Sequence, residues 1–185
     1  MTQLLLHALK NDSRQAMNDI YALHWEKVFD AAFFKTGDEA AAQDITQEIF
    51  ISLWEKRDKL HVDGSLDAYL YGAVKYRVIN YFRSSALRES HQSAFALLAD
   101  EHSALQADSR LRLTELNREL DAALALLPER MRLVMTMRRK EEKSINEIAS
   151  ELDVSVQTIK NQITASMKIL RQNLSYVVFL ALFVR

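Results

Sequence analysis

Three glycines and one proline in 185 residues constrain the fold of this chain more than any other feature of its sequence. Strands are joined by tight turns, and tight turns draw on glycine and proline for backbone conformations that other residues adopt at a cost. Helices joined by short polar links need few of either. With 49% hydrophobic and 26% charged residues, the chain can also bury a core. The composition therefore predicts an all-α protein.

The absence of cysteine excludes disulfides, thiolate zinc sites and cysteine nucleophiles. The formal net charge of −1 argues against a protein that binds nucleic acid tightly on its own. Residues 1–87 carry 10 basic and 12 acidic side chains, whereas residues 113–185 carry 11 and 9. This asymmetry favours a C-terminal part that contacts DNA and relies on a partner for affinity. The first residues lack the pattern of a signal peptide, so we expect a cytoplasmic protein.

Apolar residues recur at helical spacing through most of the chain. We expect helices over residues 12–36, 39–56 and 65–83, with a loop over 57–64. The predicted inner faces comprise Met17, Ile20, Tyr21, Leu23, His24, Val28 and Ala31 in the first helix, Ile45, Ile49 and Leu53 in the second, and Leu70, Ala73, Val74, Val78 and Tyr81 in the third.

Periodicity weakens after residue 83, where we expect a linker with a short helix at 95–98. Helix resumes over 113–127, and Pro128 lies in the first turn of a helix ending at about Arg139. Two further short helices and an apolar tail follow. The predicted architecture is two small helical domains joined by a linker, and the second is a four-helix domain. The first domain is expected over residues 1–87, the linker over 88–112, the second domain over 113–175 and the tail over 176–185.

The segment from Ser144 to Ile163 has the pattern of a helix-turn-helix. Ser144 and Glu147 form an S-x-x-E capping box that starts a helix. Asp153 falls where the turn needs a left-handed backbone, which Asp tolerates better than most residues. Ser155 then caps a second helix. The predicted buried positions are Ile145, Ile148, Ala149 and Leu152 in the first helix, and Ile159, Ile163, Leu170 and Leu174 in the second.

The second helix projects polar side chains from its N-terminal half, as a recognition helix does in the major groove. Gln and Asn pair with adenine, and Lys reaches guanine or phosphate. The same pattern also fits two antiparallel helices of any bundle, with a solvated polar face. The candidate DNA-contacting residues are Ser155, Gln157, Thr158, Lys160, Asn161, Thr164 and Lys168.

Two further faces are candidates for binding. The outer face of the helix over 65–83 carries cationic, aromatic and amide groups, which suit unstacked single-stranded DNA but also suit a solvated surface. Beside the second helix's inner stripe, Phe50 and Trp54 either widen the core or anchor a partner. The outer face comprises Lys75, Tyr76, Ile79, Asn80 and Arg83.

In this order, the segments resemble the extracytoplasmic-function sigma factors of the sigma-70 family, closest to their iron-citrate-type branch. The run from Ala42 to Trp54 is similar to the family's D-x-x-Q-E-x-F-x-x-L-W motif, and the run from Gly64 to Arg83 resembles its minus-ten region, where a loop captures a flipped-out base. Leu127 to Arg130 and the helix-turn-helix resemble its minus-thirty-five domain. The family often has Asn at Tyr76, Gly at Glu142 and Arg at Ala165.

The resemblance implies a factor that directs RNA polymerase to promoters, without catalysis or cofactor and with no small-molecule substrate. Its implied partners are core RNA polymerase, promoter DNA and an anti-sigma factor, which is membrane-bound in some systems. It implies that Asp44, Gln47, Glu48, Phe50, Leu53 and Trp54 bind polymerase, that Ser65, Lys75, Tyr76, Ile79, Asn80 and Arg83 bind the minus-ten element, and that the recognition helix binds the minus-thirty-five element.

Three alternatives remain. A stand-alone helix-turn-helix regulator needs a dimer interface and a palindromic site, and leaves the run from Asp44 to Trp54 unexplained. An enzyme is disfavoured because the five histidines have no metal-ligand spacing and no glycine-rich phosphate loop is present. The third is a helical interaction protein that binds no nucleic acid.

The tail's nine apolar residues are too few to span a bilayer, so we expect packing or a partner contact.

Overall fold

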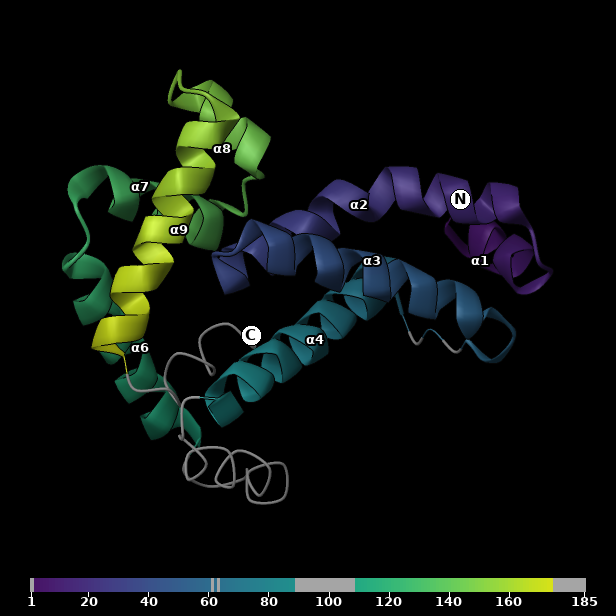
Figure 1. Cartoon of the computed structure of the whole chain (residues 1–185), viewed down its shortest axis with the longest axis horizontal. Helices are drawn as coiled ribbons and strands as arrows, with labels where there is room; N and C mark the ends of the chain where they lie inside the picture. The colour runs from purple at the N-terminus through teal and green to yellow at the C-terminus, as the bar shows by residue number, and fades with distance from the viewer. Residues whose placement is uncertain (1, 61, 63, 89–108, 175–185) are drawn as a thin grey trace. The chain divides into compact units, whose positions relative to one another are not determined.

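The computed structural model describes residues 2–60, 62, 64–88 and 109–174, and every regular element in these ranges is helical, which confirms the all-α class (Figure 1). The short helix expected at 95–98 and the tail over 176–185 lie outside the described residues. The elements are α1 (Thr2–Lys10), α2 (Arg14–Thr36), α3 (Glu39–Glu55), the 3-10 turn η1 (Arg57–Lys59), α4 (Leu66–Arg88), α6 (Ser109–Ala125), α7 (Glu129–Glu141), α8 (Ile145–Glu151) and α9 (Val156–Asn173).

The chain forms two compact units, Met1–Val78 and Ile79–Arg185, with α4 running through the division. The domain limits expected from the sequence stay a prediction. Both helices that border the expected linker are longer than predicted, since α4 continues to Arg88 and α6 already begins at Ser109. The expected loop over 57–64 contains η1, a short 3-10 turn.

In the first unit, α2 and α3 pack against each other as a helical hairpin (Figure 1). The turn between them depends on Gly37, whose φ of 63° lies in the left-handed region that glycine adopts without strain. Its N–H donates to the Phe33 carbonyl at 2.7 Å and closes α2. Asp38 then caps α3 by accepting from the Ala41 N–H at 3.1 Å. The predicted break at Gly37 and Asp38 is confirmed.

The core of the first unit follows the predicted stripes on α3 and α4. Two positions assigned to the inner face of α2 were wrong, because Tyr21 is 42% exposed and Leu23 is 50% exposed. The predicted positions Ile20, His24 and Val28 are buried, and so is every residue from Val28 to Phe34. The buried stripe residues are Ile45, Ile49 and Leu53 on α3 and Leu66, Leu70, Val74 and Val78 on α4, while Ala73 and Tyr81 are only half-buried.

The helix α1 was not predicted from the sequence. This helix packs on α2 and on η1, and its Leu9 is completely buried. Its nine residues are too few for a stable isolated helix, so the packing of Leu9 must provide much of its stability.

In the second unit, α7 and α8 pack against α9 (Figure 1). The expectation that α9 is short was wrong, since it has 18 residues. A continuous apolar stripe supports this length, with Ile159, Ile163, Met167 and Leu170 all buried at one-turn spacing. Pro128 is the N-cap of α7 and not a first-turn residue; its ψ of 147° is extended.

Candidate functional site

The helix-turn-helix begins with the predicted capping box. The Ser144 hydroxyl accepts a hydrogen bond from the Glu147 N–H at 3.2 Å, and a Glu147 carboxylate oxygen accepts from the Ser144 N–H at 2.7 Å. The N–H groups of Ser144 and Glu147 lie at the start of the helix, where no helical carbonyl can accept from them, and both are satisfied by these side chains. The pKa of the Glu147 carboxyl is lowered, first by the hydrogen bond from the Ser144 backbone and then by that from its hydroxyl.

Replacing Ser144 with alanine is expected to lower the free energy of unfolding by about 1 kcal/mol at neutral pH. Because the folded state lowers the pKa of Glu147, its contribution is present above the ordinary carboxyl pKa and is lost as pH falls through the lowered value. The stability difference between the wild type and Glu147→Gln should therefore shrink in acid. Urea unfolding at neutral and acidic pH measures both effects. Ser150→Ala, at an exposed position of α8, is the control and should cost nothing.

The turn between α8 and α9 has the backbone that the sequence predicted. Asp153 adopts a φ of 50°, in the left-handed region. The Val154 N–H donates to the Ala149 carbonyl at 3.0 Å, which satisfies one of the last carbonyls of α8. Ser155 caps α9 by accepting from the Thr158 N–H at 3.0 Å, and the two hydroxyls lie 2.8 Å apart. Leu152, expected to be buried, is half-buried.

A polar face follows the N-terminal half of α9. Gln157, Asn161, Thr164 and Lys168 are exposed, whereas Thr158 and Lys160 are half-buried. The Gln157 amide donates to the Asn161 carbonyl oxygen at 3.0 Å, so the two amides are already oriented relative to each other. The hydroxyls of Ser155 and Thr158 are occupied by the cap. Gln157 and Asn161, one helical turn apart, therefore present the exposed side-chain amides of this face.

The corner before α8 depends on a second left-handed residue. Glu142 has φ 55° and ψ 20°, and ends α7. Beside it, the Lys143 amino group lies 2.5 Å from carboxylate oxygens of both Glu141 and Glu151, and its pKa is raised, chiefly by the hydrogen bond to Glu141. Lys143 therefore ties the end of α7 to the end of α8.

Replacing Glu142 with glycine is expected to raise the free energy of unfolding by about 1 kcal/mol, because a side chain strains the left-handed backbone and glycine does not. Urea denaturation of the whole chain measures the change. Asp153→Gly serves as a comparison and should gain less, since Asp tolerates this conformation better than Glu. An unchanged or lower stability of Glu142→Gly would contradict the strain.

On α3, the proposed polymerase-binding residues divide into two sets. Asp44, Gln47 and Glu48 are exposed, and Trp54 is half-buried. Phe50 is only 3% exposed, and its ring contacts that of Tyr21 in a tilted arrangement with the centroids 4.9 Å apart. Leu53 is completely buried. Both side chains therefore lie in the core of the first unit, and their assignment as contact residues stays a prediction. Ile51, which was not among the residues predicted to bind polymerase, is 56% exposed on the same helix.

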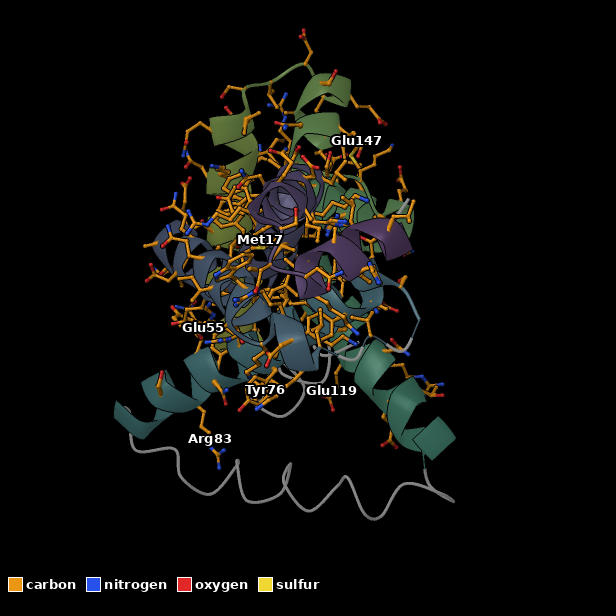
Figure 2. The ribbon with its side chains drawn as sticks, turned by 90° about the vertical axis from the view of Figure 1, so that its right-hand side faces the viewer. Met17, Glu55, Tyr76, Arg83, Glu119 and Glu147 are labelled. Atoms are coloured by element: carbon orange, nitrogen blue, oxygen red, sulfur yellow. The ribbon has the colours of Figure 1, made fainter. Side chains whose placement is uncertain are left out.

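Ser65 caps α4, as expected, by accepting from the Ala68 N–H at 3.1 Å. On the expected outer face of α4, Tyr76 is 66% exposed and Arg83 is also exposed; Figure 2 shows the Arg83 side chain projecting from the helix. Lys75, Ile79 and Asn80 are half-buried. Only part of the predicted face is thus fully open to solvent.

A groove of about 410 Å³ lies between α3 and α4 within the first unit. Two tyrosines and two cationic side chains lie along it: Tyr69, Tyr76, Lys56 and Arg77. Arg77 forms an ion pair with the Glu48 carboxylate, and its second nitrogen lies 3.5 Å from the Glu48 carbonyl. We call this feature the α3–α4 groove. It combines ring faces with hydrogen-bond donors, as binding of an unstacked base requires.

The start of α4 is also tied to α2. The buried His24 ring nitrogen lies 2.9 Å from a carboxylate oxygen of Asp67, in the first turn of α4. His24 lies on the inner face of α2, as its helical spacing predicts, but its pairing with Asp67 has no local sequence signal because the two residues are 43 positions apart. Among the described residues, no cluster of side chains suits a metal ion and no helix is long and apolar enough to cross a membrane.

Comparison with known proteins identifies both halves of the chain. Residues 20–88 match the model of sigma-70 region 2, and residues 117–170 match that of sigma-70 region 4. The chain is 24% identical over 184 residues to the ECF RNA polymerase sigma factor SigW of Bacillus subtilis, covering 94% of this chain and 97% of that protein. It is 24% identical over 170 residues to the ECF RNA polymerase sigma-E factor of Escherichia coli, covering 87% of each.

A solved structure of CnrH in complex with the cytosolic domain of CnrY is also similar, with 18% identity, a TM-score of 0.43 and coverage of 92% of this chain and 95% of that chain. The two matched regions occur in the order that the sequence predicted. The first contains α3, α4 and most of α2, and the second contains α7, α8, part of α6 and most of α9. The chain therefore belongs to the sigma-70 family and is an extracytoplasmic-function RNA polymerase sigma factor.

Proposed function

We propose that the chain directs core RNA polymerase to promoters by contacting the minus-thirty-five element through α9 and the melted minus-ten element through α4. The observation that carries this proposal is the capped α8–turn–α9 unit. The exposed Gln157 and Asn161 amides lie on α9, which is held to the core by the buried apolar stripe on its other side. Such amides pair bidentately with adenine in the major groove. The charge of Lys168 supports an added phosphate contact.

For the minus-ten element, we assign recognition of an unstacked base to the α3–α4 groove. Tyr69 and Tyr76 provide aromatic surfaces for stacking, and Lys56 provides a cation for the adjacent phosphate. Ser65 supports the site by fixing the first turn of α4, next to the loop that the family resemblance associates with base capture. Lys75, Ile79, Asn80 and Arg83 extend the contact along the helix.

For polymerase binding, we assign the exposed face of α3. Asp44, Gln47 and Glu48 give it polar and acidic character, while Ile51 and the partly covered Trp54 give it an apolar anchor. Buried Phe50 and Leu53 hold this face in place from below. Aromatic anchors surrounded by polar groups are typical of the residues that dominate binding energy at protein interfaces.

The factor needs the polymerase for most of its affinity. Unstacking costs a few kcal/mol per base, and a chain of net charge −1 gains little from general attraction to DNA. We assign it no catalytic step of its own and place its action in the cytoplasm, where polymerase meets the chromosome. An anti-sigma partner stays a prediction from the family resemblance.

The direct test is transcription by purified core polymerase on a library of templates with randomised minus-thirty-five and minus-ten segments. We expect transcripts only when the chain is added, from templates that share two elements. Failure to bind core polymerase, or transcription without sequence preference, would contradict the proposal. A stand-alone regulator would instead select a palindromic duplex in the absence of polymerase.

A further inference from the structure

Arg57, the first residue of η1, makes three contacts at the end of α3. Its guanidinium lies over the Trp54 ring, 4.2 Å from the ring centroid, and donates to the Trp54 carbonyl at 2.7 Å. Its Nε donates to the Asp12 carboxylate. One planar cation therefore links an aromatic ring, a helix end and a carboxylate that lies 45 residues earlier in the chain.

Asp12 is held in place by its own turn. It lies between α1 and α2 with a φ of 63°, and its N–H donates to the Leu9 carbonyl at 3.1 Å. Leu9 is completely buried and α1 packs on η1, so this turn is fixed to the end of α3. The match to sigma-70 region 2 begins only at residue 20. Asp12 and the preceding helix α1 thus lie outside the segment that this chain shares with the family model.

These contacts have little value as a simple stabilising ion pair. The Asp12 side chain is 72% exposed, and exposed ion pairs contribute little to folding. Their effect on Trp54 is more specific, because a guanidinium that lies over one ring face restricts the indole to a narrow range of orientations. An anchor that is ordered before binding loses less conformational freedom when its partner arrives.

We propose that Arg57, oriented by Asp12, is a positioning residue that fixes the Trp54 indole for docking on RNA polymerase, and that α1 is the accessory element that makes this arrangement possible. The inference rests on the proposed polymerase-binding role of Trp54. The inference gives a function to α1 and to the Asp12–Arg57 pair, neither of which belongs to the docking motif from Asp44 to Trp54.

The test measures the affinity of the full-length chain for core polymerase in five variants. Asp12→Asn should weaken binding roughly 3- to 10-fold, the cost of disordering one large side chain. Arg57→Lys keeps the positive charge but loses the planar stack, and it should weaken binding by a similar factor. Asp58→Asn changes an exposed acid in the same turn and is the matched charge control, expected to bind as the wild type does. Trp54→Ala and the double variant Asp12→Asn/Trp54→Ala complete a double-mutant cycle.

If Arg57 and Asp12 act through Trp54, then Asp12→Asn has no further effect once Trp54 is alanine. In a Trp25→Phe background, where Trp54 is the remaining tryptophan, Asp12→Asn should also lower its fluorescence anisotropy while the urea midpoint stays the same. Unchanged polymerase affinity of Trp54→Ala would overturn the docking role itself. If Trp54→Ala binds weakly but Asp12→Asn and Arg57→Lys bind normally, or if Asp12→Asn weakens both backgrounds equally, the positioning role is wrong.

Discussion

Replacing Gln157 and Asn161 together with alanine is expected to reduce transcription from the factor's own promoters roughly 10- to 100-fold, because a bidentate amide–base contact contributes about 1–3 kcal/mol. The two side chains are exposed, so the fold should be retained. Association with core polymerase should also be retained, since it is assigned to α3. Run-off transcription on a selected promoter, together with a polymerase-binding assay on the same preparations, measures both.

The matched control is Gln172→Ala, which removes an exposed amide from the last turn of the same helix. It should transcribe as the wild type does. Equal loss in the control, or full activity of the double variant, would contradict the assignment of α9 as the recognition helix. On templates altered only in the minus-thirty-five segment, the double variant should no longer distinguish one sequence from another.

Replacing Leu53 with alanine is expected to lower the free energy of unfolding by about 2–5 kcal/mol, because the side chain is completely buried and its loss leaves a cavity. This prediction opposes the one that the family motif suggests, in which Leu53 contacts the polymerase. Ile51→Ala should have the reverse profile, with stability nearly unchanged and polymerase affinity reduced several-fold, since Ile51 is exposed.

Urea unfolding and polymerase titration of both variants separate the two roles. At a low temperature where Leu53→Ala is still folded, its polymerase affinity should approach that of the wild type. A stable Leu53→Ala variant that fails to bind polymerase would show that Leu53 is a contact residue after all. A destabilised Ile51→Ala variant would show that α3 is covered on its outer side.

The helix-turn-helix was predictable residue by residue because its determinants are local. The capping box joins Ser144 and Glu147 across three residues, and the left-handed backbone at Asp153 is a property of that residue and its neighbours. The apolar stripe of α9 also repeats within one helix. Each of these depends on the conformation of a few adjacent residues, which a sequence pattern represents directly.

The parts that escaped prediction depend on how one helix is rotated against another. Tyr21 and Leu23 lie at helical spacing, yet Leu23 is 50% exposed and Tyr21 is 42% exposed even though its ring contacts Phe50 of α3. The pairs formed by His24 with Asp67 and by Arg57 with Asp12 join residues more than 40 positions apart. The helix α1 was missed because its stability comes from tertiary packing and not from its own propensity.

The Glu48–Arg77 ion pair also has a consequence for how binding depends on salt. A cation that neutralises a phosphate on single-stranded DNA displaces condensed counter-ions and adds about 0.7 to the slope of log affinity against log salt. Arg77 is already matched by the Glu48 carboxylate, so it adds little to this slope. Strand capture in the α3–α4 groove should therefore depend on salt less steeply than its two cations would suggest, with Lys56 as the main contributor, and Glu48→Gln should make the salt dependence steeper.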